Sequence, residues 1–279
     1  MVNFNGTIVS SSQNLGFDNR AFLYGDGIFE TVKILDGKIL FLEDHYFRLM
    51  SGMRIIRMEI PMDFTMEYFE SQLLETAKAN DCLSSGRARM TVFRNPGGLY
   101  LPTDNHVGFI VQANPLENQL YSIDKADYEV DLFKDFYVTA QLLSTIKSTN
   151  RLVNITASIF ADENGLANCL LINDSKNVIE GLQGNLFMLS ENKLITPLLT
   201  DGCLNGIMRK QILALARKID GVEVVEASIS PFDLQKADEL FLTNVVTGIR
   251  PITKYRKKEF ATSFAESLLV KLNAQVRLG

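Results

Sequence analysis

The chain has 279 residues, of which 46% are hydrophobic and 22% are charged, a balance typical of a packed globular protein. Its formal net charge is −5, with acidic and basic residues mixed along the sequence, which excludes the basic face expected of a nucleic-acid-binding protein. The three cysteines are far apart and there are two histidines, so the sequence predicts no disulfide framework and no multi-histidine metal centre.

The first residues carry no targeting pattern. Residues 1–6 lack the basic-then-apolar layout of a signal peptide. No run in the sequence approaches the roughly 18 apolar residues of a membrane-spanning helix. These features predict a cytoplasmic protein that has no membrane partner.

Apolar alternation and helical periodicity predict a hairpin, two helices and two further strands in the first third of the chain. These elements lie at residues 31–35, 38–42, 42–58, 63–80, 87–94 and 107–112. Asp36-Gly37 between the first two strands is the strongest short signal for a hairpin, and Asp63 or Thr65 would cap the second helix. A glycine-containing loop, Asn95-Pro96-Gly97-Gly98, separates the last two strands.

A polar stretch at residues 114–122 contains Pro115 and predicts a linker between a smaller lobe, residues 1–113, and a larger lobe, residues 123–279. The larger lobe mixes strands and helices, and Lys147 lies in one of its loops. Strands are expected at residues 128–133, 169–172, 186–189, 194–195, 222–226 and 239–242, and helices at residues 151–162, 206–219 and 260–275. Because the elements follow no regular βαβ rhythm, the predicted fold class is α+β in two lobes.

Two segments could offer backbone amides to an anion. In residues 203–209 a loop runs into a helix, with Asn205 as the expected N-cap and the N–H groups of Ile207 and Met208 exposed to an anion. An ordinary capped helix accounts for the same residues. Residues 243–248 follow an apolar strand and form a turn of small and hydroxyl residues, which can also bind phosphate or be no more than a turn.

A third segment, residues 177–181, has Glu180 between apolar residues and a glycine. Burying such a carboxylate is costly unless a cationic group faces it. The alternative is a glutamate on the outer face of an edge strand.

Taken in order, five segments resemble the class IV (fold-type IV) pyridoxal-phosphate enzymes, which include branched-chain aminotransferases, D-amino acid aminotransferases and aminodeoxychorismate lyases. The segments lie at residues 19–31, 45–49, 147–152, 180–187 and 205–209. The resemblance covers nearly the whole chain. It implies the two-lobed fold of D-amino acid aminotransferase and the cofactor pyridoxal 5'-phosphate.

The resemblance also implies roles for individual residues. Lys147 would form the Schiff base with the cofactor and move protons, and Thr31 would assist it in catalysis. Glu180 would keep the ring nitrogen of the cofactor protonated, and Arg48 would bind the cofactor phosphate. The remaining cofactor-binding positions are Leu204, Ile207, Met208, Val246 and Thr247. The implied substrate-binding positions are Tyr24, Phe29, Arg94 and Tyr100.

Two reactions fit this resemblance. The Asn150-Arg151-Leu152 run after Lys147 and the Met208-Arg209 pair are closer to the lyases, which convert 4-amino-4-deoxychorismate to 4-aminobenzoate and pyruvate. Leu99, however, stands where the lyase loop is expected to carry an arginine. The alternative is an aminotransferase of branched-chain or D-amino acids with a 2-oxo acid acceptor. Either enzyme would act on a small molecule as a homodimer, with residues 94–100 as the candidate contribution to the partner's site.

Overall fold

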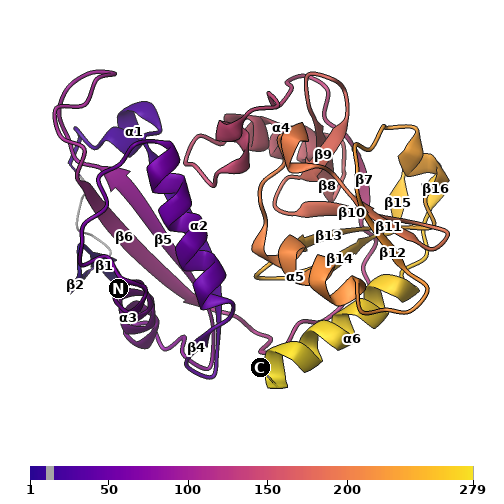
Figure 1. Cartoon of the computed structure of the whole chain (residues 1–279), viewed down its shortest axis with the longest axis horizontal. Helices are drawn as coiled ribbons and strands as arrows, with labels where there is room; N and C mark the ends of the chain where they lie inside the picture. Colours follow the sequence, from indigo (N-terminus) through magenta and orange to yellow (C-terminus); the bar gives the residue numbers. More distant parts are fainter. Residues whose placement is uncertain (11–15, 279) are drawn as a thin grey trace. The chain divides into compact units, whose positions relative to one another are not determined.

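The computed structural model describes residues 1–10 and 16–278 (Figure 1). The chain divides into two compact units. Unit 1 comprises Met1–Gln119 and Ile146–Asn150, and unit 2 comprises Leu120–Thr145 and Arg151–Gly279. The predicted lobes, 1–113 and 123–279, include residues 11–15 and 279, which lie outside the described residues.

Unit 1 is an antiparallel sheet with two helices packed on one face. Among the described residues the sheet has six strands in the order β2-β1-β6-β5-β3-β4. Their bounds are β1 Val2–Phe4, β2 Thr7–Val9, β3 Gly27–Leu35, β4 Lys38–Ile39, β5 Ser85–Arg94 and β6 Val107–Pro115. The helices are α1 Arg20–Tyr24, α2 Leu42–Ile55 and α3 Met66–Lys78, and α2 and α3 pack against the sheet in Figure 1.

Alternation along the strands decides which face of this sheet is buried. Ile28, Val32 and Ile34 of β3 point into a core that α2 and α3 cover, whereas residues 29, 31 and 33 point to the opposite face. The Asp36-Gly37 turn joins β3 to β4 with positive φ at both positions, 49° and 75°, as a tight hairpin requires. This confirms the predicted hairpin.

The second helix of unit 1 begins at one of its two predicted caps. Thr65 is the N-cap of α3, and its side chain accepts a hydrogen bond from the N–H of Tyr68 at 3.2 Å. Asp63 lies outside the helix. The predicted first helix, residues 42–58, is also present as α2, but it ends at Ile55, three residues earlier than predicted.

Unit 2 is built on a mixed sheet of ten strands among the described residues. The main path is β12-β11-β10-β9-β8-β7-β15-β16, and β13 pairs with β10 and β14. The bounds are β7 Glu129–Leu132, β8 Asn168–Ile172, β9 Val178–Gly181, β10 Asn185–Ser190, β11 Lys193–Thr196, β12 Glu223–Glu226, β13 Glu239–Asn244, β14 Gly248–Ile252, β15 Lys254–Tyr255 and β16 Lys258–Glu259. The pairs β7 with β8, β7 with β15 and β11 with β12 are parallel.

The helices described in this unit, α4 Leu152–Glu163, α5 Ile207–Ala216 and α6 Ser263–Leu278, pack on the sheet. Helix α4 contacts β8, whereas α5 and α6 contact each other and the β13–β14 hairpin. The described part of the unit also forms 3-10 turns at Leu142–Thr145, Leu199–Asp201 and Asp233–Lys236. The α+β prediction is confirmed by this mixture of helices and sheets.

The unit boundaries differ from the predicted lobes in one respect. The chain leaves unit 1 after Gln119, inside the stretch predicted as a linker, but residues 146–150 return to unit 1. The sequence had assigned them to the second lobe, because a segment of five residues carries no local signal for the sheet it joins. No described helix is long and apolar enough to cross a membrane.

Candidate active site

The segment that carries Lys147 is held on the edge of β3. The N–H of Phe29 donates to the carbonyl of Lys147 at 2.8 Å, and the N–H of Thr149 donates to the carbonyl of Gly27 at 2.9 Å. Strand β4 pairs with β3 only at residues 34 and 35, so this part of the edge is open to the returning chain. Ile146, one residue earlier, is buried in the unit 1 core. Backbone pairing on one side and an apolar anchor on the other therefore fix the backbone of Lys147.

The Lys147 amine lies against an aromatic ring. Its Nζ is 4.6 Å from the centroid of the Phe29 ring, and the guanidinium carbon of Arg89 is 3.7 Å from the same centroid. Arg89 is opposite Thr31 in the β3–β5 register, and residues 29 and 31 share one face of β3. The structure thus gathers Lys147, Phe29, Thr31 and Arg89 in unit 1.

Arg89 was missed by the sequence analysis. Its signal was the alternation of Arg87 and Arg89 along an otherwise apolar strand, which places both side chains on the face opposite the core. A pattern of this kind is common on solvent-exposed sheet faces, so it does not single out Arg89 as a functional residue.

Arg48 forms part of a buried charge network on the core face of β3. Its Nε and Nη2 donate to the two carboxylate oxygens of Glu30 at 2.6 and 2.7 Å, and Nδ1 of His45 lies 2.7 Å from Glu30 Oε2. Burial by itself would raise the pKa of Glu30, but the charge of Arg48 and the hydrogen bonds from His45 and Arg48 outweigh it and lower this pKa to about 2. Burial lowers the pKa of His45, which favours the neutral ring.

The tautomer of His45 follows from its partner. Glu30 is ionised and can only accept, so Nδ1 carries the proton and donates it. Nε2 is then an acceptor, and it is buried without a hydrogen-bond partner among the described residues. Lys147 contributes to lowering the pKa of His45 by its positive charge, which indicates that the amine and this network lie in one electrostatic neighbourhood.

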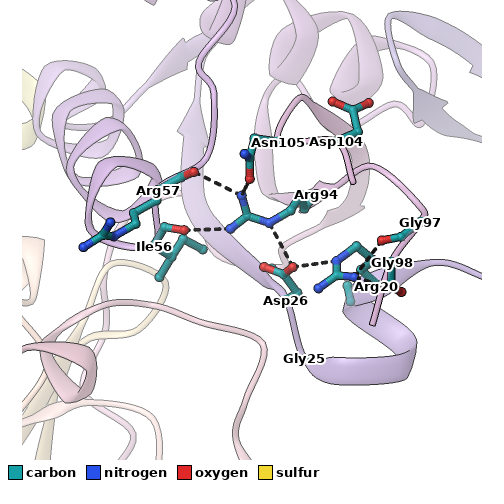
Figure 2. Close-up of polar contacts among 12 residues, drawn as sticks. Arg20, Gly25, Asp26, Ile56, Arg57, Arg94, Gly97, Gly98, Asp104 and Asn105 are labelled. Carbon is teal, nitrogen blue, oxygen red and sulfur yellow. Dashed lines mark hydrogen bonds and ion pairs between the residues drawn. The ribbon is translucent and has the colours of Figure 1, made fainter. Parts of the chain in front are cut away.

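Arg94 is engaged by protein groups throughout its guanidinium (Figure 2). Its Nε donates to Asp26 Oδ2 at 2.9 Å, Nη1 to the carbonyl of Arg57 at 3.1 Å and to Asn105 Oδ1 at 2.6 Å, and Nη2 to the carbonyl of Ile56 at 2.6 Å. The side chain is buried. This geometry favours a structural role for Arg94 over the predicted contact with a substrate, because its donors already have internal acceptors.

The two predicted tyrosines lie next to each other on the surface of unit 1. The ring centroids of Tyr24 and Tyr100 are 5.8 Å apart, with the planes inclined by 58°. Tyr24 is 38% exposed and Tyr100 is 90% exposed, so both rings are accessible to a ligand. Tyr24 is the last residue of α1, and Tyr100 belongs to the loop between β5 and β6.

In unit 2, Glu180 is a buried carboxylate in β9, paired with Leu171 of β8 and Asn185 of β10. Its Oε2 accepts a hydrogen bond from the N–H of Leu204 at 2.9 Å. Burial, and after it the negative charge of Glu180, raise the pKa of the neighbouring Cys203 thiol to about 12. The edge-strand alternative is therefore wrong, since β9 lies between two strands and the carboxylate is inside the unit.

Helix α5 begins one residue later than the sequence predicted. Its N-cap is Gly206, which has extended backbone angles and makes no side-chain cap hydrogen bond, so the prediction of Asn205 as N-cap is wrong. A tertiary contact makes glycine necessary at this N-cap, since a Cβ added to Gly206 would lie 1.8 Å from Asn185 Oδ1. Asn185 is held there by a 2.7 Å hydrogen bond from Nδ2 to the carbonyl of Leu204. Ile207 and Met208 are the first two residues of the helix, where backbone N–H groups lack helical acceptors.

In the second predicted anion-binding turn, residues 243–248, a side chain of the turn already occupies the backbone amides. The N–H groups of Val246 and Thr247 both donate to Asn244 Oδ1, each at 2.9 Å. An anion could use these amides only if the Asn244 side chain turned away. Thr243, which pairs with Asn185 in the β10–β13 register, instead has a buried Oγ1 without a hydrogen-bond partner in the described part of the chain.

The predicted positions thus fall into two sets. Unit 1 holds Tyr24, Phe29, Thr31, Arg48, Arg94, Tyr100 and Lys147. Unit 2 holds Glu180, Leu204, Ile207, Met208, Val246 and Thr247. Within the described residues there is no group of three or more His, Cys, Asp or Glu side chains that could hold a metal ion. The functional roles of both sets stay predictions.

Three relatives show what this sequence is similar to. A protein from Methanocaldococcus jannaschii described as a branched-chain-amino-acid aminotransferase is 31% identical, over 85% of this chain and 80% of its own length. A D-alanine aminotransferase of Bacillus licheniformis is 28% identical over 90% of this chain and 86% of its own. An aminodeoxychorismate lyase of Vibrio harveyi is 26% identical over 84% and 85%.

Solved structures share the fold. A branched-chain aminotransferase from Thermoproteus uzoniensis, solved with norvaline, has a TM-score of 0.88 at 24% identity and covers 99% of this chain and 94% of its own. A branched-chain amino acid aminotransferase from Thermobaculum terrenum in its PLP form has a TM-score of 0.85 at 24% identity and covers 99% and 93%. The sequence model of class IV aminotransferases matches residues 27–255. With this match and the 31% identical relative, the chain belongs to the class IV aminotransferase family.

Proposed function

We propose that the chain is a pyridoxal-phosphate-dependent enzyme in which Lys147 holds the cofactor covalently. The observation that carries this proposal is the fixed position of the lysine: its segment pairs with β3, and its Nζ lies 4.6 Å from the Phe29 ring. Its neighbours Thr31 and Arg89 supply a hydroxyl and a cation, which are useful to a reaction on an amino acid or a related carboxylate. The family, and a solved family member in PLP form, support the same cofactor.

The residues present fit this cofactor. A phosphate dianion calls for backbone N–H groups at a helix start and a cation, which Ile207, Met208 and Arg48 would supply. At the start of α5 there is room for a glycine only, and the Thr243 Oγ1 beside Asn185 is a buried hydroxyl that lacks a partner among the described residues. The buried carboxylate of Glu180 suits a protonated pyridine nitrogen. Leu204 would act through its N–H, which orients Glu180.

Val246 and Thr247 are weaker members of the proposed site, because Asn244 accepts from both of their amides. We retain them as cofactor-binding positions on condition that Asn244 changes rotamer when phosphate binds. Tyr24, Phe29 and Tyr100 are retained as proposed substrate contacts. Arg89 takes the place proposed for Arg94, because it is the cation beside Phe29, whereas Arg94 is engaged within unit 1.

When bound, pyridoxal phosphate supplies an electron sink for the bond that breaks next to the substrate nitrogen. The residues of the chain would then do the rest. Lys147 would take the proton released from the substrate carbon and return it, since its amine is held at a fixed place against the Phe29 ring. Arg89 would orient the substrate carboxylate, and the Thr31 hydroxyl would donate a hydrogen bond to the departing group.

The first reaction we propose is the conversion of 4-amino-4-deoxychorismate to 4-aminobenzoate and pyruvate. Lys147 would remove the ring proton at C4, and loss of pyruvate would make the ring aromatic. The atoms balance without a second substrate. The Asn150-Arg151-Leu152 run and the lyase relative at 26% identity support this choice.

The second candidate reaction is amino-group transfer. It is favoured by the higher identity, 31% and 28%, to relatives described as branched-chain and D-alanine aminotransferases. In that case Lys147 would move the proton between the substrate carbon and the cofactor, and a 2-oxo acid would be needed as acceptor. The family resemblance also favours a homodimer for either reaction, and a cytoplasmic location stays a prediction from the sequence pattern.

One experiment tests the cofactor and both reactions. Purified protein supplied with pyridoxal phosphate should show the visible absorbance of a lysine-bound cofactor, and Lys147→Ala should abolish it while Lys218→Ala, an exposed lysine on the same chain, leaves it unchanged. With 4-amino-4-deoxychorismate, the wild-type protein should release 4-aminobenzoate and pyruvate, at least about 10³ times faster than Lys147→Ala. Arg89→Gln should raise KM in the same assay.

The two reactions separate by their need for an acceptor. Transfer from L-leucine or D-alanine to 2-oxoglutarate without formation of 4-aminobenzoate would replace the lyase with the aminotransferase. A wild-type protein that forms no adduct with pyridoxal phosphate, or an adduct that survives in Lys147→Ala, would contradict the proposal as a whole.

A further inference from the structure

A single carboxylate oxygen in unit 1 joins two buried arginines (Figure 2). Asp26 Oδ2 accepts from Arg20 Nε at 2.8 Å and from Arg94 Nε at 2.9 Å. The side chains of Arg20 and Arg94 are 3% and 6% exposed. We call these three residues the Asp26 clamp. Two guanidinium groups withdrawn from water around one carboxylate are costly to bury unless their other donors are also satisfied.

Arg20 also binds the loop between β5 and β6, through its Nη1. Its Nη1 donates to the carbonyls of Gly97 at 2.9 Å and Leu99 at 2.7 Å, with the carbonyl of Gly98 at 3.5 Å. The loop folds tightly around this contact. Gly97 and Gly98 have φ of 118° and 71°, and a Cβ on Gly98 would lie 2.1 Å from the carbonyl oxygen of Leu101.

The loop held by Arg20 and helix α1 both carry exposed apolar side chains. Leu99, Tyr100 and Leu101 are among the exposed large hydrophobic residues, as are Phe22, Leu23 and Tyr24 of α1. Arg20 is the first residue of α1, and its guanidinium carbon is 4.8 Å from the centroid of the Tyr24 ring at the end of the same helix. One side chain therefore fixes Tyr24 and the backbone that carries Tyr100, whose rings are 5.8 Å apart. Exposed apolar residues held in a defined arrangement mark a binding surface.

The same clamp is connected to the Lys147 segment. Asp26 lies between Gly25 and Gly27, and the Thr149 side-chain hydroxyl donates to the Gly25 carbonyl at 2.9 Å while the Thr149 N–H donates to the Gly27 carbonyl. Arg94 ties this junction to the end of α2 through the carbonyl of Ile56. The loop and α1, through Arg20, and the Lys147 segment, through Thr149, are thus all bonded to residues 25–27.

We propose that Arg20 is a positioning residue that determines substrate recognition, by holding Tyr24 and the loop from Gly97 to Leu101 in one fixed arrangement. This rests on the proposed function, in which Lys147 is the reacting amine and the two tyrosines contact the substrate. Arg20 itself touches neither substrate nor cofactor. Its loss should therefore weaken substrate binding more than it slows the chemical step.

The test compares Arg20→Gln and Arg20→Lys with Arg54→Gln, an exposed arginine in the last turn of α2. The assay uses whichever substrate the wild-type protein converts. Arg20→Gln should raise KM by about tenfold or more and change kcat by less than about threefold, while cofactor absorbance stays at the wild-type level. Arg20→Lys should have a KM between those of wild type and Arg20→Gln. A lysine ammonium can donate to the loop carbonyls, but it cannot bind them and Asp26 at the same time as the guanidinium does. Chymotrypsin should cleave at Tyr100 faster in Arg20→Gln than in Arg54→Gln.

Gly98→Ala tests the inference independently, because it distorts the loop while Arg20 stays in place. Gly98 is exposed, so this variant should fold and keeps the inference testable even if Arg20→Gln does not fold. It should raise KM in the same way. A wild-type KM in Gly98→Ala or Arg20→Gln, or a fall in kcat with KM unchanged, would overturn the proposal. A wild-type protein that binds no pyridoxal phosphate and converts no substrate would instead overturn the proposed function, and this inference with it, before any variant is made.

Discussion

Glu30 illustrates how one buried carboxylate can organise charged neighbours. It lies on the core face of β3, where an isolated carboxylate would become protonated, yet Arg48 and His45 hold its pKa at about 2. The two arginine nitrogens and the histidine nitrogen together account for both of its oxygens. The proposed phosphate ligand Arg48 therefore has its orientation fixed before any cofactor arrives.

This network makes a prediction about stability and pH. The pKa of Glu30 in the folded chain lies below its ordinary value of 4.5, so its stabilising contribution is complete above about pH 4.5 and is lost as the pH falls toward 2. Glu30→Gln should lower the unfolding free energy at pH 7 by roughly 3 kcal/mol, because it leaves Arg48 without its buried counter-charge. Urea unfolding at pH 7, 5, 4 and 3 should show the difference from wild type shrinking at the acid end.

The exposed Glu75→Gln in α3 is the matched control and should be nearly neutral at every pH. A difference between wild type and Glu30→Gln that stays constant from pH 7 to pH 3 would mean that Glu30 is not the titrating group.

At the scale of elements, the start of α5 shows a helix terminus shaped by its neighbours. Gly206 is capped by no side chain, and Asn185 of β10 occupies the space that a Cβ would need. The next strand brings Thr243 opposite Asn185. Strand pairing, and not a local capping motif, therefore determines the surroundings of the first amides of the helix.

Gly206→Ala should consequently displace Asn185 or the helix start, with a loss of about 1–3 kcal/mol of stability and a weaker affinity for pyridoxal phosphate. Thermal unfolding and titration of the cofactor absorbance would measure the two effects. In the Gly206→Ala/Asn185→Ala double variant the clash is removed, so the two changes should not be additive. Additive losses would show that the crowding at Gly206 has no part in the effect.

At the scale of the whole molecule, the path of the chain couples the two units covalently at more than one point. After entering unit 2 the chain returns to unit 1 for Ile146–Asn150 and leaves again. Ile146 belongs to the core formed by β3, β5, β6, α2 and α3, although the chain on both sides of the Ile146–Asn150 segment belongs to unit 2. Lys147, the proposed site of cofactor attachment, is therefore anchored by the folding of unit 1.

Ile146→Ala should destabilise the protein by about 2–4 kcal/mol, as other large-to-small changes in a packed core do. It should also weaken cofactor binding, because the backbone of Lys147 would lose its apolar anchor. Denaturant unfolding and cofactor titration would measure both, with the half-exposed Ile159→Ala of α4 as the control. A stability loss like that of the control would contradict the anchoring role.

Local signals were sufficient for a large part of this architecture. The Asp36-Gly37 hairpin, the Thr65 cap of α3 and the alternation of β3 depend on contacts within a few residues, so the sequence predicted them. The order of motifs along the chain was also sufficient to identify the family, because that order is a property of the sequence itself.

Only the tertiary structure decided which partner each polar group has. Asp26 and the backbone carbonyls of two segments, residues 56–57 and 97–99, meet Arg20 and Arg94. Asn244 accepts from the amides of Val246 and Thr247, and Asn185 requires glycine at position 206. A charged or amide side chain reaches any acceptor that folding brings within about 3 Å, whatever its separation in sequence. Contacts of this kind between distant residues leave no periodic trace, so position in the chain could suggest Arg94 as a substrate ligand while the fold uses it as a support.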